Sequence, residues 1–448
     1  MAVQLGSSFL DRTMQHLRKV WHGIGDSRSD DIELRPDLPD EDLPVLNDWL
    51  RACLKAEGGE IAARARTAKL GEAYLLLDDN GRRRFLLQLA EQFDCDDQVI
   101  EQAIDGWRGS VGLERQQARQ QLQRTLEPSR LQLLRQFTEL PEGVKFLVDM
   151  RAELLRLRKA EPALAALEAD LKRLLIHWFD IGLLRLEQIS WHSSAELLEK
   201  LIAYEAVHAI QSWEDLKNRL DSDRRCFAFF HPNMPGEPLI FVEVALVNGL
   251  ATSVQALLDE DAPILDLHQA DTAIFYSISN AQPGLAGISF GNFLIKRVVG
   301  LLQREFSNLQ QFATLSPVPG FSRWLAAQED DSCKALHSQL VLPHWWQDAD
   351  LAEGLRGPLM QQAARYLAQA RRGQRALDPV AHFHLSNGAE MAQLNWLADC
   401  SEKGLQQSAG LMVNYRYQLA QVEQNSEGYL NHGDVCTSTL VSALLTRP

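Results

Sequence analysis

Apolar residues recur at three- and four-residue spacing along the first part of the chain, from about Leu43 to Leu183. The spacing is clearest in LPVLNDWLRACLKAE, VKFLVDMRAELLRLRKA and EPALAALEADLKRLLIHWFD. It is the period of amphipathic helices that bury one face, and strand-like alternation is scarce in this region. The pattern therefore predicts an all-α helical bundle, to which we assign residues 1–188. No motif within it points to chemistry.

From about Trp191 the pattern becomes typical of strands. RRCFAFFHPNMPGEPLIFVEVALV predicts a hairpin whose Pro/Gly-containing loop is longer than the tightest turns. DTAIFYSIS predicts a strand, NFLIKRVVGLLQREF an amphipathic helix, and QQFATLS a strand that ends at Ser316. Because this order forms a crossover unit, it predicts a sheet with at least one parallel pair. We expect residues 189–448 to form a mixed α/β domain, so that the whole chain is an α+β multidomain protein.

The bulk composition narrows the classes of partner. The chain has 448 residues, enough for two or three domains. Its formal net charge of -15 argues against a nucleic-acid or anionic-membrane partner, since both require a basic surface. The apolar run PLIFVEVALV is short and interrupted by Glu243, so no membrane span is predicted. The N-terminus has no continuous apolar core of signal-peptide type, and we expect a cytoplasmic protein, with the mitochondrial matrix less favoured.

Cysteine and histidine spacing predicts neither a disulfide framework nor a metal site. The six cysteines are scattered without a CxxC pair, which favours free thiols in a reducing compartment. The twelve histidines include no HExxH motif and no Cys/His cluster at zinc spacing. We therefore predict no structural metal.

A glycine-containing loop between a predicted strand and a predicted helix is the first candidate site. Gly284, Gly287 and Gly291 would let backbone N–H groups approach phosphate oxygens near the start of a helix, and Lys296 and Arg297 would add charge. The spacing matches neither GxGxxG nor a Walker loop. Two explanations stay open, a phosphate site and a tight strand-to-helix turn.

Hydroxyl and imidazole groups form the second candidate set. Ser316 lies in FATLSPVPGF before two prolines, although Ser-Pro also starts ordinary turns. DPVAHFHLSNGA holds His382 and His384, which point the same way if the segment is extended and diverge if it is helical. In GLMVNYRYQL, Tyr415 and Tyr417 share one side of a predicted strand. Structural explanations, a buried core histidine and cross-strand packing, stay open for these residues.

Several of these stretches together resemble the malonyl-CoA decarboxylase family. They are FYSISNAQPGLAGISFGNFLIKRVV, LSPVPGFSRWL, DPVAHFHLSNGA and GLMVNYRY, preceded by WHSSAELLEKLIAYEAVHAIQSWEDLKNRL and RRCFAFFHPNMPGEPLIFVEVAL. The resemblance implies an N-terminal helical domain used for self-association and a catalytic domain resembling the GNAT acyltransferase fold. It also implies that the glycine-containing loop holds the pyrophosphate of coenzyme A through Ala286, Gly287, Ile288, Ser289, Phe290, Gly291 and Asn292. Some members of the family have glutamate at the position of Ser289.

The same resemblance implies the chemistry. Malonyl-CoA would lose CO2 to form an enolate and then acetyl-CoA, with Ser316 and His384 as catalytic residues and Tyr417 as a supporting hydroxyl. Preorganised donors would stabilise the enolate oxygen, and an imidazole with an ordinary pKa of ~6.5 would protonate the enolate carbon at neutral pH. No metal or organic cofactor is implied, because the thioester itself accepts the electrons. The expected partners are malonyl-CoA and acetyl-CoA, with a homo-oligomer formed through the helical domain.

Three other functions stay open. A serine hydrolase would use Ser316 as a nucleophile, but the GxSxG elbow is missing around it. An acyltransferase would need an acceptor substrate in addition to acyl-CoA. A non-catalytic acyl-CoA sensor would bind without turnover and would not depend on Ser316 and His384.

Overall fold

The structure, a computed structural model, describes residues 17–24, 32–55, 59–288 and 293–446. The chain divides into two compact units. The first, the helical unit, takes the chain up to Arg185 together with Phe230–Pro238 and Gln282–Ile288. The second, the sheet unit, contains Leu186–Phe229, Leu239–Ala281 and Ser289–Pro448. A helical N-terminal region followed by a mixed-sheet region agrees with the predicted α+β class.

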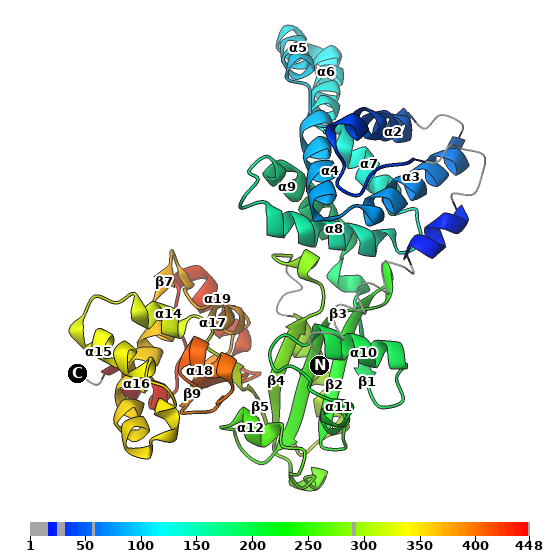
Figure 1. Cartoon of the computed structure of the whole chain (residues 1–448). Helices are drawn as coiled ribbons and strands as arrows, with labels where there is room; N and C mark the ends of the chain where they lie inside the picture. The colour runs from blue at the N-terminus through cyan, green and yellow to red at the C-terminus, as the bar shows by residue number, and fades with distance from the viewer. Residues whose placement is uncertain (1–16, 25–31, 56–58, 289–292, 447–448) are drawn as a thin grey trace. The chain divides into compact units, whose positions relative to one another are not determined.

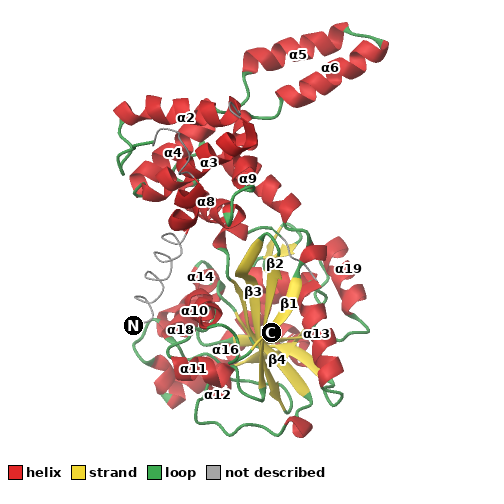
Figure 2. Ribbon diagram, turned by 90° about the vertical axis from the view of Figure 1, so that its right-hand side faces the viewer, coloured by secondary structure: helices red, strands yellow, loops and turns green. Residues whose placement is uncertain are grey.

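The helical unit confirms the helices predicted from the apolar spacing. An aromatic cluster lies in its core, where the Phe146 ring contacts Trp21, Tyr74 and Phe137 at centroid distances of 5.0, 5.5 and 4.9 Å. Helices α5 and α6 lie side by side in this unit (Figures 1 and 2). The helices are α2 (Leu43–Lys55), α3 (Gly59–Leu76), α4 (Asp79–Gln92), α5 (Asp97–Gly109), α6 (Gly112–Thr125), α7 (Ser129–Phe137), α8 (Gly143–Leu157) and α9 (Leu164–Trp178), with short 3-10 turns at Asp40–Asp42 and Ile181–Leu183.

The strands of the main sheet follow the order β1-β2-β3-β4-β5-β10-β6, with β9 paired to β10. Figure 2 shows the strands labelled β1 to β4 with helices on either side. The predicted hairpin is present as β2 and β3, but its loop is shorter than predicted: only Pro232 and Asn233 separate the strands, and Gly236 lies within β3. The strands are β1 (Arg185–Ile189), β2 (Arg224–His231), β3 (Met234–Val247), β4 (Thr272–Asn280), β5 (Gln311–Thr314), β6 (Ser316–Pro317), β9 (Glu390–Asn395) and β10 (Met412–Arg416), and a separate pair comprises β7 (Arg371–Arg372) and β8 (Arg375–Ala376).

The predicted parallel pair is confirmed as β4 and β5, which pair from Thr272 opposite Gln311 to Phe275 opposite Thr314. The pairing ends there, after Leu315 donates its N–H to the Phe275 carbonyl at 3.0 Å. The predicted continuation of this strand to Ser316 is wrong, because Ser316 turns away and pairs in β6 with Val413 of β10. The two strands therefore part at Leu315.

Helices pack against the sheet and complete the core of this unit. α13 connects β4 to β5, as the crossover prediction required.

All six cysteines are free thiols, as predicted. Within the described ranges, none of the helices combines the length and apolar character needed to cross a bilayer. The helices of the sheet unit are α10 (Ala195–Tyr204), α11 (Trp213–Arg219), α12 (Val254–Leu257), α13 (Phe293–Glu305), α14 (Phe321–Ala326), α15 (Asp331–Leu340), α16 (Ala349–Gln369), α17 (Pro379–Ser386), α18 (Glu402–Ser408), α19 (Val422–His432) and α20 (Thr439–Thr446), with 3-10 turns at Leu267–Gln269 and Trp345–Gln347, while a further turn at Pro283–Leu285 belongs to the helical unit.

Candidate active site

A cavity of about 280 Å³ opens in the sheet unit where β4 and the segment after β5 part. Most of its walls are apolar, so a ligand inside it exchanges water for hydrocarbon and aromatic surface. Polar side chains line it only in part, among them those of Asn280, Ser316 and His384. The other lining residues are Val207, Ile240, Phe275, Tyr276, Ile278, Leu294, Leu315, Pro317, Pro379, Val380 and Phe383.

Ser316, His384 and Tyr417 form one buried hydrogen-bonded chain. The Ser316 Oγ atom lies 3.0 Å from Nε2 of His384, although the two residues are 68 positions apart. On the other side of the ring, Nδ1 lies 2.7 Å from the Tyr417 hydroxyl. The three side chains are 5%, 3% and 5% exposed, respectively. The fold therefore brings all three candidate residues into contact, with the serine and the histidine at the cavity wall.

The hydrogen-bond directions assign the tautomer of His384. The Ser316 hydroxyl donates to Thr314 Oγ1 at 2.8 Å, so its single proton is not available to the imidazole. Nε2 must then carry the proton and donate it to Ser316 Oγ. In the neutral ring Nδ1 is left as an acceptor, and the Tyr417 hydroxyl donates to it. The N–H of His384 consequently faces the cavity side of the site.

The local fold explains why His384 and His382 differ. The segment is the helix α17, so the helical alternative for the two histidines holds. His384 turns inward and stacks on the Tyr415 ring, with centroids 4.5 Å apart and planes 24° apart. His382 is partly exposed and has a separate tyrosine partner, the Tyr429 hydroxyl, 2.9 Å from its Nδ1. One helix thus holds two similar His–Tyr pairs, of which only one contacts the cavity.

Burial changes the electrostatics of this chain. The apolar surroundings lower the pKa of His384 to about 3, because a buried imidazolium loses its hydration. The expected ordinary pKa of ~6.5 is therefore wrong for the free protein, in which His384 is neutral at physiological pH. Burial also raises the pKa of Tyr417 well above its usual value, so that hydroxyl keeps its proton.

Two neighbouring residues were missed as part of this site. Thr314 accepts from Ser316 and also from the Tyr415 backbone N–H, at 3.2 Å. Its position two residues before Ser316 puts both hydroxyls on one side of an extended chain, which is a signal that the sequence contains. Asn414 fills the break between β5 and β6 by donating to the Thr314 carbonyl at 2.8 Å, and no sequence pattern predicts that contact.

The glycine-containing loop is described only in its first part. Ala286, Gly287 and Ile288 belong to the helical unit, whereas Ser289, Phe290, Gly291 and Asn292 lie outside the described residues. Arg151 of α8 donates to the carbonyls of Gly284 and Ala286, the latter at 2.8 Å, and forms an ion pair with Glu168. Gly287 has a φ of +72°, in the left-handed region that favours glycine.

Two cations lie at or after this loop. A Cβ atom built at Gly287 would lie 3.4 Å from the Nζ of Lys172, on α9. Lys172 makes no hydrogen bond or ion pair with other side chains in the described ranges, which leaves its charge available to an anion. Lys296, one of the predicted charges, is exposed and lies 3.9 Å from the Glu423 carboxylate.

Comparison with known proteins connects these features to one family. A family described as "Malonyl-CoA decarboxylase C-terminal domain" matches residues 182–448, and one described as "Malonyl-CoA decarboxylase N-terminal domain" matches residues 93–179. The mitochondrial malonyl-CoA decarboxylase of Rattus norvegicus is 37% identical over 407 residues, 82% of this chain and 82% of the relative. The crystal structure of malonyl-CoA decarboxylase from Rhodopseudomonas palustris matches with a TM-score of 0.85 and 42% identity, over 90% of this chain and 99% of that chain. The corresponding structure from Agrobacterium vitis matches with a TM-score of 0.83 and 39% identity, over 90% and 100%.

Proposed function

Because the chain belongs to the malonyl-CoA decarboxylase family, we propose that it is a carboxy-lyase that converts malonyl-CoA to acetyl-CoA and CO2. The reaction takes place in the cavity beside Ser316 and His384. The observation that carries the proposal is the 3.0 Å contact between Ser316 Oγ and His384 Nε2 at the wall of a largely apolar cavity. A hydroxyl and a proton-bearing imidazole nitrogen are the groups that this reaction needs.

When the malonyl carboxylate binds, the imidazole N–H redirects its hydrogen bond from Ser316 Oγ to one carboxylate oxygen. The Ser316 hydroxyl rotates away from Thr314 and donates to the other carboxylate oxygen. When the C–C bond breaks, its electron pair moves into the thioester and forms an enolate, and CO2 leaves. This requires the breaking bond to lie roughly perpendicular to the thioester plane, so the carboxylate must be held in a fixed direction. Ser316 suits this task because it is followed by Pro317, whose ring restricts the backbone. Thr314 Oγ1, which accepts the Ser316 proton in the free site, can donate to Ser316 Oγ once that proton points to the carboxylate.

Backbone N–H groups on the free edge of β4 stabilise the enolate oxygen. After Phe275 this strand no longer pairs with β5, and strand edges present unpaired N–H groups. Ile278 and Asn280, which follow on the same strand, line the cavity. Donors fixed in a water-poor site stabilise developing charge without reorganisation.

His384 supplies the proton to the enolate carbon. The free site keeps the imidazole neutral because burial lowers its pKa to about 3, and the incoming carboxylate provides the opposite charge that raises it again. The imidazole then gains a proton at Nδ1, and the Tyr417 hydroxyl changes from donor to acceptor. After CO2 leaves, Nε2 gives its proton to the enolate carbon, which leaves the neutral ring protonated at Nδ1. The resting tautomer returns when Nδ1 releases this proton and Nε2 takes one up, and the Tyr417 hydroxyl becomes the donor again. One proton is consumed per turnover. The positive imidazolium is present in the buried site only together with the negative carboxylate or enolate.

Coenzyme A is held through its phosphates by the run Ala286, Gly287, Ile288, Ser289, Phe290, Gly291 and Asn292. Supporting this part are the left-handed Gly287 and the Lys172 Nζ beside it, which has no side-chain partner among the described residues. β4, this loop, α13 and β5 also follow one another in the order that a GNAT-like fold implies.

An acyl-enzyme mechanism is less favoured. A serine nucleophile needs a base that takes its proton, but here Nε2 donates to Ser316 and the serine donates to Thr314. The hydrogen bonds therefore run in the direction opposite to that of a hydrolase pair.

Turnover of malonyl-CoA by matched variants tests the proposal. We expect Ser316→Ala and His384→Ala each to lower kcat by about 10²-fold or more, whereas His382→Ala, on the same helix, keeps wild-type turnover. Acetyl-CoA and CO2 are measured together with free CoA and malonate. Wild-type turnover in both site variants would exclude this site, free CoA with malonate would indicate hydrolysis, and binding without any product would indicate a sensor.

A further inference from the structure

The Asp378 carboxylate caps the helix that carries His384. Asp378 directly precedes α17 and its side chain is fully buried, at 0% exposure. Its Oδ1 atom accepts from the backbone N–H groups of Val380 and Ala381, both at 2.9 Å. Such a cap satisfies N–H groups that have no partner within the helix and fixes where the helix begins. The orientation of α17, and with it of His384, therefore depends on this carboxylate.

The same carboxylate also holds the segment that follows Ser316. Gly320 lies beside this carboxylate, since a Cβ built on it would be 3.9 Å from Asp378 Oδ2. The Tyr366 hydroxyl donates to Oδ2 at 3.2 Å. Two of the three residues between Ser316 and Gly320 are prolines, which stiffen this segment. A Cβ at Gly320 would lie 2.2 Å from the Tyr366 hydroxyl, so glycine is needed for this close approach.

These contacts close a ring around the catalytic pair. The ring runs from Ser316 along the proline-containing segment to Gly320, through the Tyr366 hydroxyl to Asp378, and along α17 to His384. It closes through the 3.0 Å contact between Nε2 and Oγ. Because its other links are a stiff segment, buried hydrogen bonds and a helix, the distance between the two catalytic groups has little freedom.

We infer that Asp378 is a positioning residue of the decarboxylation site, which keeps His384 aligned with Ser316. It is not among the residues that line the cavity, so it acts through the other two and not on the substrate. The inference rests on the proposed function of Ser316 and His384. It adds a buried acid that links them without contacting either one.

Asp378→Asn is the main test, because it keeps one oxygen for the helix cap and replaces the other by an NH2 group. That group cannot accept the proton that the Tyr366 hydroxyl donates to Oδ2. We expect kcat for malonyl-CoA to fall about 10-fold or more, since small misplacements of catalytic groups are costly, while KM changes less than about threefold. In a His384→Ala background the same substitution should cause no further fall, because the alignment that it disturbs no longer matters.

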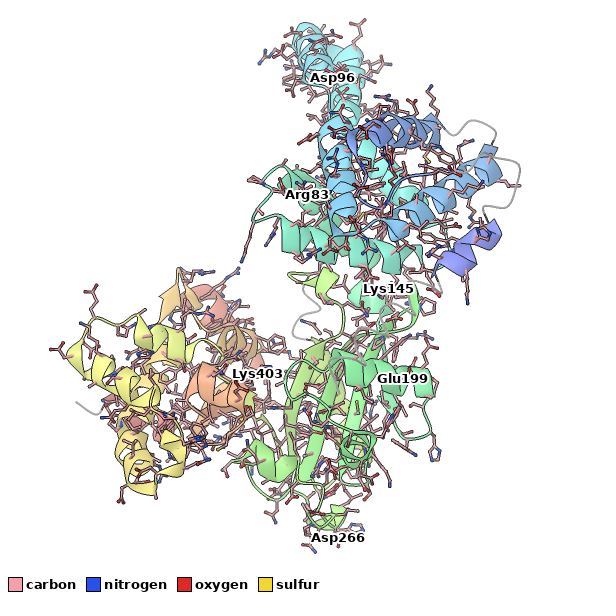
Figure 3. All side chains as sticks on the ribbon, viewed as in Figure 1. Arg83, Asp96, Lys145, Glu199, Asp266 and Lys403 are labelled. Carbon is pink, nitrogen blue, oxygen red and sulfur yellow. The ribbon has the colours of Figure 1, made fainter. Side chains whose placement is uncertain are left out.

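Two other variants control for folding. Asp96, labelled in Figure 3, caps α5 of the helical unit by accepting from the N–H groups of Gln98 and Val99, and Asp96→Asn should leave kcat unchanged. Tyr366→Phe removes one donor to Asp378 but keeps the carboxylate. We expect Tyr366→Phe to lower kcat about threefold. If Asp378→Asn does not fold, Tyr366→Phe serves as the main test.

Three results would overturn the inference. The first is wild-type kcat in folded Asp378→Asn, or in Tyr366→Phe where that variant serves as the test. The second is an equal fall of kcat when Asp378→Asn is added to His384→Ala, which would show an effect independent of the histidine. The third is wild-type turnover of His384→Ala itself, which refutes the proposed function and the inference together, so the single variants separate the two failures.

Discussion

The hydroxyl of Tyr417 offers a sharp test of how His384 is held. Tyr417→Phe removes the group that donates to Nδ1 at 2.7 Å and keeps the ring that fills the space. Nδ1 then lies buried without a partner, and an unsatisfied buried polar atom costs about 1–3 kcal/mol. The variant also loses the acceptor that the charged imidazole requires. If this whole cost falls on the transition state, kcat decreases about 5- to 150-fold.

The second His–Tyr pair on α17 provides a matched control. The Tyr429 hydroxyl lies 2.9 Å from Nδ1 of His382 and also accepts the N–H of Ala376 at 2.8 Å. Tyr429→Phe should therefore destabilise the fold by a similar amount and leave kcat unchanged. Because neither tyrosine lines the cavity, both variants should keep a wild-type KM.

Steady-state kinetics and thermal unfolding of the two variants give the answer. We expect both to unfold at a lower temperature than the wild type, and only Tyr417→Phe to lose turnover. Equal kcat in the two variants would refute the reasoning, since the Nδ1 hydrogen bond would then have no part in the reaction. A change confined to KM in Tyr417→Phe would likewise contradict a role in holding the imidazole.

Two further predictions concern pH and the glycine-containing loop. Since burial lowers the pKa of His384 to about 3, the histidine of the free protein does not titrate between pH 5 and 8. Because one proton is taken up with the substrate, kcat/KM should decrease steadily as pH rises across this range, without a break near ~6.5; a plateau below ~6.5 followed by a decrease above it would contradict the assignment. Protonation of His384 favours the unfolded chain. Its contribution to the free energy of unfolding should therefore fall as pH drops from ~6.5 towards 3. Urea unfolding of the wild type and of His384→Phe measures this contribution. Gly284→Ala places a Cβ 1.8 Å from the Val148 carbonyl oxygen and should destabilise the protein by about 1–3 kcal/mol. Gly354→Ala, with open space around it on α16, should instead stabilise the protein by about 0.5–1 kcal/mol, and equal unfolding temperatures in these two variants would contradict the packing argument.

The sequence predicts the elements of this fold better than their boundaries. Helical periodicity identifies α8 and α13, and the order of elements identifies the parallel pair, because these patterns are local. The break at Leu315 is not local. It depends on which strand each residue pairs with: Leu315 hydrogen-bonds to Phe275, whereas Ser316 pairs with Val413. The inclusion of Phe230–Pro238 and Gln282–Ile288 in the helical unit has the same origin in tertiary packing.

The candidate site shows a similar division. Ser316 and His384 were chosen through the family resemblance, since nothing in their spacing requires them to meet. The tautomer of His384 and its lowered pKa follow from depth and neighbours, which no single segment contains. Asp378 followed by proline resembles an ordinary helix cap in the sequence, and its second role depends on Tyr366 and Gly320, which come to lie beside it only in the folded chain.

The buried histidine also explains why two hydroxyls that do not line the cavity lie next to its catalytic pair. Removal of water from a carboxylate and an imidazole makes their mutual attraction strong, but the same removal makes each charge costly when its partner is absent. A site of this kind needs neutral groups that accept either protonation state, and hydroxyls do so because they can both donate and accept. Thr314 and Tyr417 provide such hydroxyls on either side of the Ser316–His384 pair. Substrate binding should therefore be accompanied by the uptake of one proton, and the proton that leaves on acetyl-CoA should be the one that Nε2 carried.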